Sequence, residues 1–416
     1  MFDATAGTAG GPPAMRDFLS MTAAQPGRPA PIPLNVVTGF LGAGKTTLLN
    51  RLLRDPWMAD TIVVINEFGE IGLDHLFVEK VDEDLVLMAA GCLCCSIRGD
   101  LVATLEDLLR RRDNGRIRPF RRVVIETTGL ADPAPILHTI LRHPYLSMRY
   151  ALDGVVTLVD AVNGEATLDA HEEAVKQAAV ADCLVLTKAD LLPEGSPDSL
   201  KRLTARLAAL NPAADIVRVD DAAATAERLL DHGLYCPDGK IGDVARWLGA
   251  EAFEEAHHHG HGHDHHGHPD HDHHHHDDHG HSHGHHHHDV NRHDARIRAF
   301  CLTSDRPIPA PSFDLFLDLL RSVHGPNLLR VKGLVAVKEE PEHPVVIHGV
   351  QHIFHPPVVL DAWPDGDRRT RIVFILRDLD ESFVRRLWGA FDGTPAVDTP
   401  DAQALTDNPL AIGGNR

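Results

Sequence analysis

A glycine-rich stretch near the start of the chain combines the residue types that bind phosphate groups. It runs from Gly39 to Thr47 and matches the pattern G-x-x-x-x-G-K-[ST] at every position. Lys45 is placed to reach the β- and γ-phosphates of a nucleotide, and the Thr46 hydroxyl is placed to bind Mg²⁺. The nucleotide contacts that we predict from this loop come from Gly39, Gly42, Ala43, Gly44, Lys45, Thr46 and Thr47.

A carboxylate at the end of a later apolar segment would complete the magnesium site. Arg121 to Ile125 is typical of a buried strand, and Glu126 follows it in the manner of a Walker B acid, with Glu in place of the commoner Asp. Glu126 can hold Mg²⁺ through a water molecule, and Gly129 has the spacing at which a glycine N–H contacts a γ-phosphate. We therefore predict that Lys45, Thr46, Glu126 and Gly129 form the catalytic group.

The tetrapeptide from Thr187 to Asp190 follows the apolar segment Cys183 to Leu186 and is similar to the guanine-specificity motif Asn-Lys-x-Asp. An aspartate carboxylate accepts hydrogen bonds from guanine N1–H and from the exocyclic amine, and adenine offers no such pair of donors. Thr187, Lys188 and Asp190 are therefore predicted to bind the base, which favours GTP over ATP. Thr187 stands where the motif has Asn, which leaves the contact made by that position open.

Three thiols lie within four residues, at Cys92, Cys94 and Cys95. Thiolates are soft ligands that favour Zn²⁺ or Cu(I), so we predict a metal site here. Glu70 is a further candidate ligand, and His75 could supply a nitrogen. The remaining cysteines, Cys183, Cys236 and Cys301, are isolated and are expected to be small core residues.

A histidine-rich tract extends from His257 to His288 and holds 20 of the 31 histidines. Segments of this composition cannot bury a core, and neutral imidazoles bind Zn²⁺, Ni²⁺, Co²⁺ or Cu²⁺ at weak, exchanging sites. We predict that the tract handles metal, and the alternative is a solvated linker with incidental metal affinity.

The elements that must position these groups alternate between strand and helix. Leu34 to Val37 and Thr61 to Ile65 are predicted strands, as are Val155 to Val159 and Ile216 to Val219. Such alternation indicates an α/β fold with a mostly parallel sheet covered by helices, followed by a smaller C-terminal α+β domain. The predicted boundaries are a disordered tail (1–30), a P-loop domain (31–232), a linker helix (233–256), the disordered His-rich linker (257–289), the C-terminal domain (295–395) and a tail (396–416).

Composition narrows the partners and the compartment. The formal net charge of −20 argues against a nucleic acid or an anionic membrane as partner. No apolar run approaches the roughly 20 residues that a membrane-spanning helix needs, and no secretory signal is evident. Clustered rather than dispersed cysteines point to a reduced compartment, so we expect the protein to be cytoplasmic.

In the order and spacing of five motifs, the chain resembles the CobW-like family of P-loop GTPases, relatives of the HypB and UreG nickel-insertion GTPases. The resemblance implies GTP hydrolysis coupled to delivery of a transition metal, often zinc, with the cysteine motif as the metal site. It covers roughly residues 31 to 395, and the family also carries a His-rich linker and a small C-terminal domain. The motifs are at 39–47, 66–70, 91–95, 126–133 and 187–190.

Residues and resemblance together predict a metallochaperone that uses GTP and Mg²⁺ and delivers Zn²⁺ to a client metalloprotein, with Co²⁺ or Ni²⁺ as alternative cargo. Intrinsic turnover is expected to be slow, because Leu130 stands where small GTPases carry a Gln that orients water. A nucleotide- or metal-dependent homodimer is a further expectation. Two rival hypotheses remain: a small-molecule kinase, and a metal-storage protein that acts through the His-rich tract.

Overall fold

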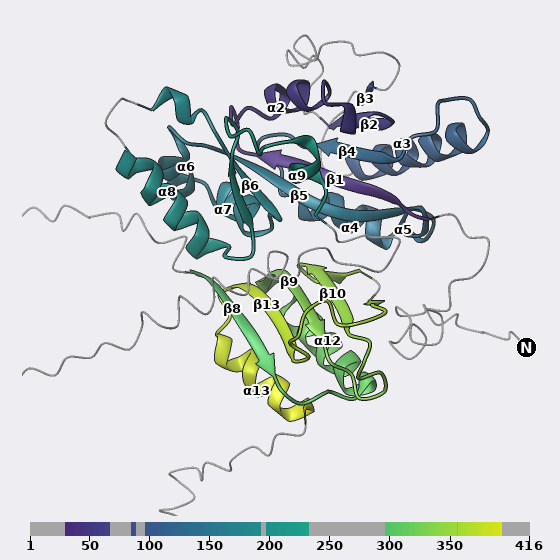
Figure 1. Cartoon of the computed structure of the whole chain (residues 1–416), viewed down its shortest axis with the longest axis vertical. Coiled ribbons are helices and arrows are strands. Elements are labelled where there is room, and N and C mark those ends of the chain that lie inside the picture. The colour runs from purple at the N-terminus through teal and green to yellow at the C-terminus, as the bar shows by residue number, and fades with distance from the viewer. Residues whose placement is uncertain are drawn as a thin grey trace, which may run out of the picture.

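The computed structural model describes residues 30–66, 85–88, 96–192, 197–232, 296–355 and 357–392. These residues form two sheets, one above the other in Figure 1. The first sheet has seven parallel strands, and the second has six antiparallel strands. A parallel α/β domain followed by a smaller C-terminal α+β domain was the predicted fold class, and it is confirmed.

The parallel sheet has the strand order β3-β2-β4-β1-β5-β6-β7 in the described residues. From β1 the chain runs to β2 and to the edge strand β3, where it reverses and returns through β4 to β5 on the other side of β1. The connections that leave the neighbouring strands β1 and β4 therefore go in opposite directions. In open α/β sheets, ligands bind at the carboxyl ends of the strands beside such a reversal. The strands are β1 (Ile32–Gly39), β2 (Thr61–Asn66), β3 (Leu85–Met88), β4 (Arg122–Glu126), β5 (Tyr150–Asp160), β6 (Cys183–Thr187) and β7 (Asp215–Arg218).

Helices cover both faces of this sheet because successive side chains of each strand are apolar and point to opposite faces. Val37 and Val156 pack against α2 (Lys45–Leu52) and α9 (Ala226–Leu230) on one face. The opposite face is covered by α3 (Ser96–Asp113), α4 (Ala134–Arg142), α5 (Pro144–Arg149), α6 (Gly164–Ala170), α7 (Glu172–Ala179) and α8 (Pro197–Leu210). Short 3-10 turns occur at η1 (Pro56–Met58) and η3 (Ala189–Leu191).

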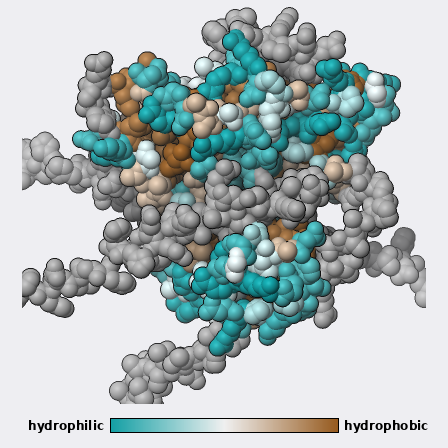
Figure 2. Space-filling view, in the orientation of Figure 1, coloured by the Kyte–Doolittle hydropathy of each residue, from teal (hydrophilic) through white to brown (hydrophobic). Residues whose placement is uncertain are grey.

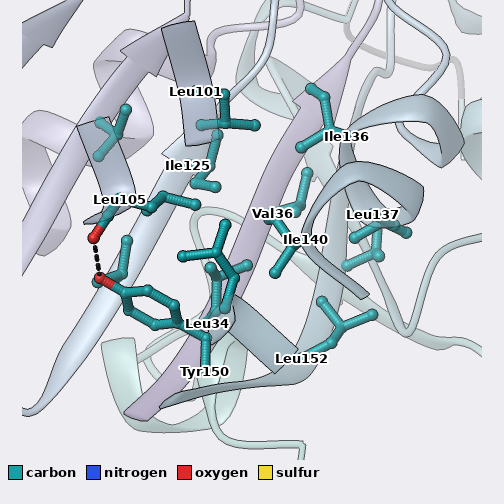
Figure 3. Close-up of a cluster of buried hydrophobic side chains, with 14 of the residues drawn as sticks. Leu34, Val36, Leu101, Leu105, Ile125, Ile136, Leu137, Ile140, Tyr150 and Leu152 are labelled. Atoms are coloured by element: carbon teal, nitrogen blue, oxygen red, sulfur yellow. Dashed lines mark hydrogen bonds between the residues drawn. The ribbon is translucent and has the colours of Figure 1, made fainter. Parts of the chain in front are cut away.

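Figure 3 shows the core on that second face, where Leu34 and Val36 of β1 meet side chains of α3 and α4. Helix α3 contributes Leu101 and Leu105 to this core, where both side chains are buried. Tyr150 is also buried, and its hydroxyl donates to the Leu105 carbonyl at 3.1 Å. The buried phenol therefore has its hydrogen bond, as a polar group in a core requires.

The C-terminal sheet has the order β11-β10-β9-β13-β8, and β12 pairs with β10. Helices α12 and α13 cover one face with an aromatic core that includes Phe313, Phe316 and Trp388. The visible outer face of this domain is largely hydrophilic (Figure 2). Its elements are β8 (Ile297–Ser304), α12 (Ala310–His324), η5 (Gly325–Asn327), β9 (Leu328–Val335), β10 (Val345–Val350), β11 (Ile353–Phe354), β12 (Val358–Val359), β13 (Thr370–Arg377) and α13 (Glu381–Phe391).

The other face of the C-terminal sheet packs against the parallel domain. Leu329, Val350 and Ile375 join the core that contains β1 and α4. Asp182, which follows α7, forms buried ion pairs with Arg330 and Lys332 of β9. Breaking one partner of a buried pair is strongly destabilising, so these charges fix how the two sheets sit against each other.

Strand β9 is longer than the sequence predicts. In the sequence, the apolar run from Leu334 to Val337 predicts a strand that starts at Leu334, yet β9 begins at Leu328. Arg330 and Lys332 interrupt the apolar pattern, but both are buried, and both form ion pairs with Asp182. The predicted domain boundaries stay predictions, and both tails, the linker helix and the His-rich tract lie outside the described residues. No helix in the described part of the chain is long and apolar enough to cross a membrane.

Candidate functional site

The phosphate-binding loop connects β1 to α2 at the carboxyl edge of the parallel sheet. Gly42 and Gly44 have φ values of 72° and 91°, a left-handed conformation that glycine adopts without strain. Lys45 is buried, and its ammonium donates to the carbonyl oxygens of Gly39 at 2.9 Å and of Phe40 at 3.3 Å. The lysine is thus held inside its own loop, and α2 starts directly behind it with its N–H groups toward the loop.

Thr46 and Glu126 meet across the sheet although 80 positions separate them. The Thr46 hydroxyl donates to Oε1 of Glu126 at 3.1 Å, and Glu126 is buried. Strands β1 and β4 pair in parallel register, with Val37 opposite Glu126, which brings the Walker B acid beside the loop. A hydroxyl and a carboxylate are the hard oxygen ligands that Mg²⁺ prefers, so this donor set fits the predicted ion.

Gly129 lies against the phosphate-binding loop itself. A Cβ atom added at Gly129 would come within 2.7 Å of the Leu41 backbone nitrogen, so the close approach requires glycine. The loop after β4 is held there by Gln177 of α7, whose amide donates to the carbonyl oxygens of Gly129 at 3.2 Å and of Ala131 at 2.9 Å. This arrangement leaves the Gly129 backbone beside the loop that would carry the phosphates.

Thr187 occupies the position at which the predicted guanine motif usually has Asn. The Thr187 hydroxyl donates to the Ala43 carbonyl at 2.8 Å and approaches the Val159 carbonyl at 3.3 Å. The first residue of the motif therefore ties the end of β6 to the phosphate-binding loop, and a threonine hydroxyl suffices for that contact. The predicted base-binding and phosphate-binding segments are brought together by this hydrogen bond.

The other two residues of the motif differ in their surroundings. Lys188 adopts a left-handed conformation with φ of 59°, and its ammonium donates to Asp160 at 2.8 Å. Burial raises the pKa of Asp160, but hydrogen bonds from Lys188, from the Asn163 side chain and from two backbone N–H groups outweigh it and lower the pKa overall. Asp160 is therefore an ionised anchor for Lys188. Asp190 is exposed in η3, where its carboxylate is open to a ligand.

The predicted metal ligands Cys92, Cys94 and Cys95 lie outside the described residues, as do Glu70 and His75. Among the residues that are described, no group of three or more His, Cys, Asp or Glu side chains could hold a metal ion. Cys183 is fully buried in a strand, as predicted for a core residue. Burial raises the pKa of the Cys301 thiol to about 11, which makes it a poor nucleophile and a poor metal ligand.

Sequence reasoning missed two residues of this site. Asp160 ends an apolar strand just as Glu126 does, so the same pattern of a strand followed by an acid could have identified it. Gln177 has no such signal, because a glutamine on an amphipathic helix is normally solvated. It is nevertheless only 1% exposed, and it contacts the loop that contains Gly129.

Two family models match the chain. The model described as CobW/HypB/UreG, nucleotide-binding domain, matches residues 33–218. The model described as cobalamin synthesis protein cobW C-terminal domain matches residues 297–391. The two matched segments coincide with the two sheets of the structure.

Curated relatives are similar over the first of these segments. The zinc chaperone YjiA of Escherichia coli is 41% identical over 189 residues, which is 45% of this chain and 58% of that protein. The zinc-regulated GTPase metalloprotein activator 1 of Schizosaccharomyces pombe is 34% identical over 203 residues, or 46% of this chain and 47% of that protein. The chain thus aligns with about half the length of the curated relatives it matches.

A solved structure extends the similarity across both domains. The crystal structure of Zn(II)-bound YjiA GTPase from E. coli aligns with a TM-score of 0.58 and 27% identity, covering 87% of this chain and 99% of that one. This alignment and the two matched family models cover the same pair of domains. The chain therefore belongs to the CobW/HypB/UreG family and carries both its nucleotide-binding domain and the CobW C-terminal domain.

Proposed function

We propose that this protein is a GTP-hydrolysing metallochaperone that binds Zn²⁺ at Cys92, Cys94 and Cys95 and delivers it to a client metalloprotein. The relatives named as zinc chaperones and as a zinc-regulated GTPase metalloprotein activator support this proposal. The single observation that carries it is the contact between Thr46 and Glu126 at 3.1 Å, which joins a phosphate-binding loop to a buried acid.

The chemistry at the nucleotide follows from these side chains. On nucleotide binding, Lys45 would exchange its contacts with the Gly39 and Phe40 carbonyls for phosphate oxygens. Mg²⁺, when bound by Thr46 with support from Glu126, would neutralise charge that develops on the phosphates. The Gly129 N–H is the proposed sensor of the γ-phosphate.

Recognition of guanine would rest on Asp190, with Lys188 beside it and Thr187 securing the phosphate-binding loop. GTP should therefore bind far more tightly than ATP, and a single-turnover assay should detect GDP and phosphate. Asp190→Asn should weaken GTP binding by at least about 1–3 kcal/mol, the usual cost of an unmatched polar group once the bound base has buried it. It should also improve binding of xanthosine triphosphate, whose ring offers an acceptor that matches the new amide.

A matched control for this substitution is Asp198→Asn, which removes an exposed carboxylate from the first turn of α8. We expect the control to leave both nucleotide affinities unchanged. Equal affinity of the unmodified protein for GTP and ATP would contradict the assignment of guanine recognition to Asp190.

Zn²⁺ is the proposed cargo, and Co²⁺ or Ni²⁺ are the alternatives. A second candidate function, metal storage, is favoured by the 20 histidines between His257 and His288. Storage would need no GTP hydrolysis. Activity in the single-turnover assay therefore distinguishes the two functions, and the metal content of protein purified without a histidine-affinity step would identify the cargo.

A further inference from the structure

Helix α7 lies between the nucleotide site and the C-terminal sheet. It contacts β1, the strand that leads into the phosphate-binding loop, and it also contacts β9 of the other domain. Figure 1 shows α7 on the side of the parallel sheet that faces β8 and β9. A short helix with contacts on both sides is a candidate for transmitting the nucleotide state.

On the nucleotide side, α7 makes two contacts. His171, the residue before the helix, stacks on Phe40 of the phosphate-binding loop with ring centroids 4.4 Å apart. Gln177, in the last turn of the helix, donates to the carbonyls of Gly129 and Ala131. A shift of α7 would therefore move both the phosphate-binding loop and the loop after β4, the two loops that would surround a γ-phosphate.

On the other side, ion pairs attach both ends of α7 to the C-terminal domain. Glu172 at its start pairs with Arg377 of β13. Asp182, just past its end, pairs with Arg330 and Lys332 of β9. Because Asp182 also accepts from the Val155 N–H at 2.8 Å, its position is fixed on the parallel sheet as well.

The loop after β4 also touches the C-terminal domain directly. The Gln351 amide donates to Asp132 at 3.4 Å, three residues beyond Gly129. Between α7 and the phosphate-binding loop is a cavity of about 210 Å³, lined by residues that include Phe40, Leu41 and Ala174. A close-packed interface would resist a shift of α7, and this space permits one.

We propose that α7 couples the nucleotide site to the C-terminal domain, with Gln177 as the positioning residue for the γ-phosphate loop. This inference rests on the proposed function and adds its regulation. Docking of the C-terminal domain holds α7, α7 holds Gly129 against the phosphate-binding loop, and the held loop favours GTP over GDP. Because linkage is reciprocal, GTP in turn tightens the attachment of the C-terminal domain.

The test is a double-mutant cycle in the full-length protein. Gln177→Leu keeps the side-chain volume but removes both amide hydrogen bonds. Arg377→Gln removes the charge that the C-terminal domain presents to Glu172, which retains Lys176 at 3.2 Å as a partner. Arg368→Gln is the matched control, since it removes an ion pair with Glu342 within the C-terminal domain.

The readout is the ratio of affinities for a fluorescent non-hydrolysable GTP analogue and for fluorescent GDP. We expect this ratio to fall roughly 5–10-fold in Gln177→Leu and about 2–5-fold in Arg377→Gln, while GDP affinity stays within about twofold. The double variant should have the same affinity ratio as Gln177→Leu alone, because Gln177→Leu already removes the coupling from α7 to the Gly129 loop on which Arg377 acts. Arg368→Gln should leave the ratio unchanged.

Two outcomes would overturn the coupling: an unchanged ratio in Arg377→Gln, or effects of the two substitutions that multiply independently. Should Gln177→Leu fail to fold, Arg377→Gln alone decides, since it lies at a partly exposed site. The proposed function fails on a different result, namely no preference for GTP over ATP in the unmodified protein. The two failures are therefore distinguishable.

Discussion

At the scale of single residues, the site depends on hydrogen bonds that join segments distant in the sequence. Thr187 and Ala43 are 144 positions apart, and the contact between them connects the segment proposed to bind the base to the proposed phosphate-binding loop. The motif could be read from the sequence, but this contact could not, because a threonine hydroxyl can donate to many acceptors. Only the pairing of β5 with both β1 and β6 brings these two residues together.

Thr187→Val tests the importance of that hydrogen bond. The substitution preserves shape but leaves the Ala43 carbonyl without its donor, a loss that costs about 1–3 kcal/mol when the group is buried. We expect GDP and GTP affinities to fall together by up to about tenfold, as measured by fluorescent-nucleotide titration. Thr187→Asn restores a donor and should recover most of the affinity. Normal affinity in Thr187→Val would show that the loop does not need this contact.

At the scale of elements, strand β9 shows where sequence patterns stop being informative. Strands β1, β2 and β4 were predictable because their side chains are almost uniformly apolar. Arg330 and Lys332 break that pattern in β9, and their burial depends on Asp182 from the other domain. A charge that is neutralised by a distant partner looks like a surface residue in the sequence. The burial of Gln177 was likewise not predictable from the sequence, because its carbonyl partners lie 46 and 48 positions earlier in the chain.

The interface that contains β9 also predicts a dependence of stability on pH. His348 and His355 stack with centroids 4.7 Å apart, near Arg330, Lys332 and Asp182. Burial first, and Arg330 second, hold the pKa of His348 well below its usual value and lower that of His355 to about 4. Both rings are therefore neutral in the folded protein at pH 7, and the ring of His355 remains so at pH 5.

The direction in which stability changes with pH follows from the protons that each state binds. Unfolded histidine has a pKa of about 6.5, so below that pH the unfolded chain binds protons that the folded state excludes, and stability is lost as the pH falls toward 4. For His355 alone this amounts to about 2 kcal/mol between pH 7 and pH 5. His355→Phe keeps the ring stack and should make the loss between these pH values smaller in chemical denaturation. An identical loss in both proteins would contradict this account of His355.

At the scale of the whole molecule, a nucleotide domain and a smaller sheet domain are joined through buried charges and α7. The order of motifs indicated both domains, but their mutual packing required the structure, since Asp182 and Arg330 lie 148 positions apart. The cysteine motif lies in the chain between β3 and α3, before the Glu126 strand. A γ-phosphate that orders the loop after Glu126 should therefore also influence a metal held by these thiolates.

The most direct test of the proposed function is therefore whether zinc affinity depends on the nucleotide. Zn²⁺ would be titrated against a chromophoric chelator with a non-hydrolysable GTP analogue, with GDP, or with no nucleotide. The protein would lack residues His257 to His288, so that weak imidazole sites do not mask the result. Cys94→Ser serves as the control that should weaken the site and remove its nucleotide dependence.

We predict that the GTP analogue tightens Zn²⁺ binding by a factor within the roughly 5–150-fold range of typical allosteric coupling, and that Zn²⁺ tightens binding of the analogue by the same factor. GDP should leave Zn²⁺ affinity near its value without nucleotide. The same Zn²⁺ affinity in all three states would contradict the chaperone cycle, and the protein would then be a GTPase that merely carries zinc.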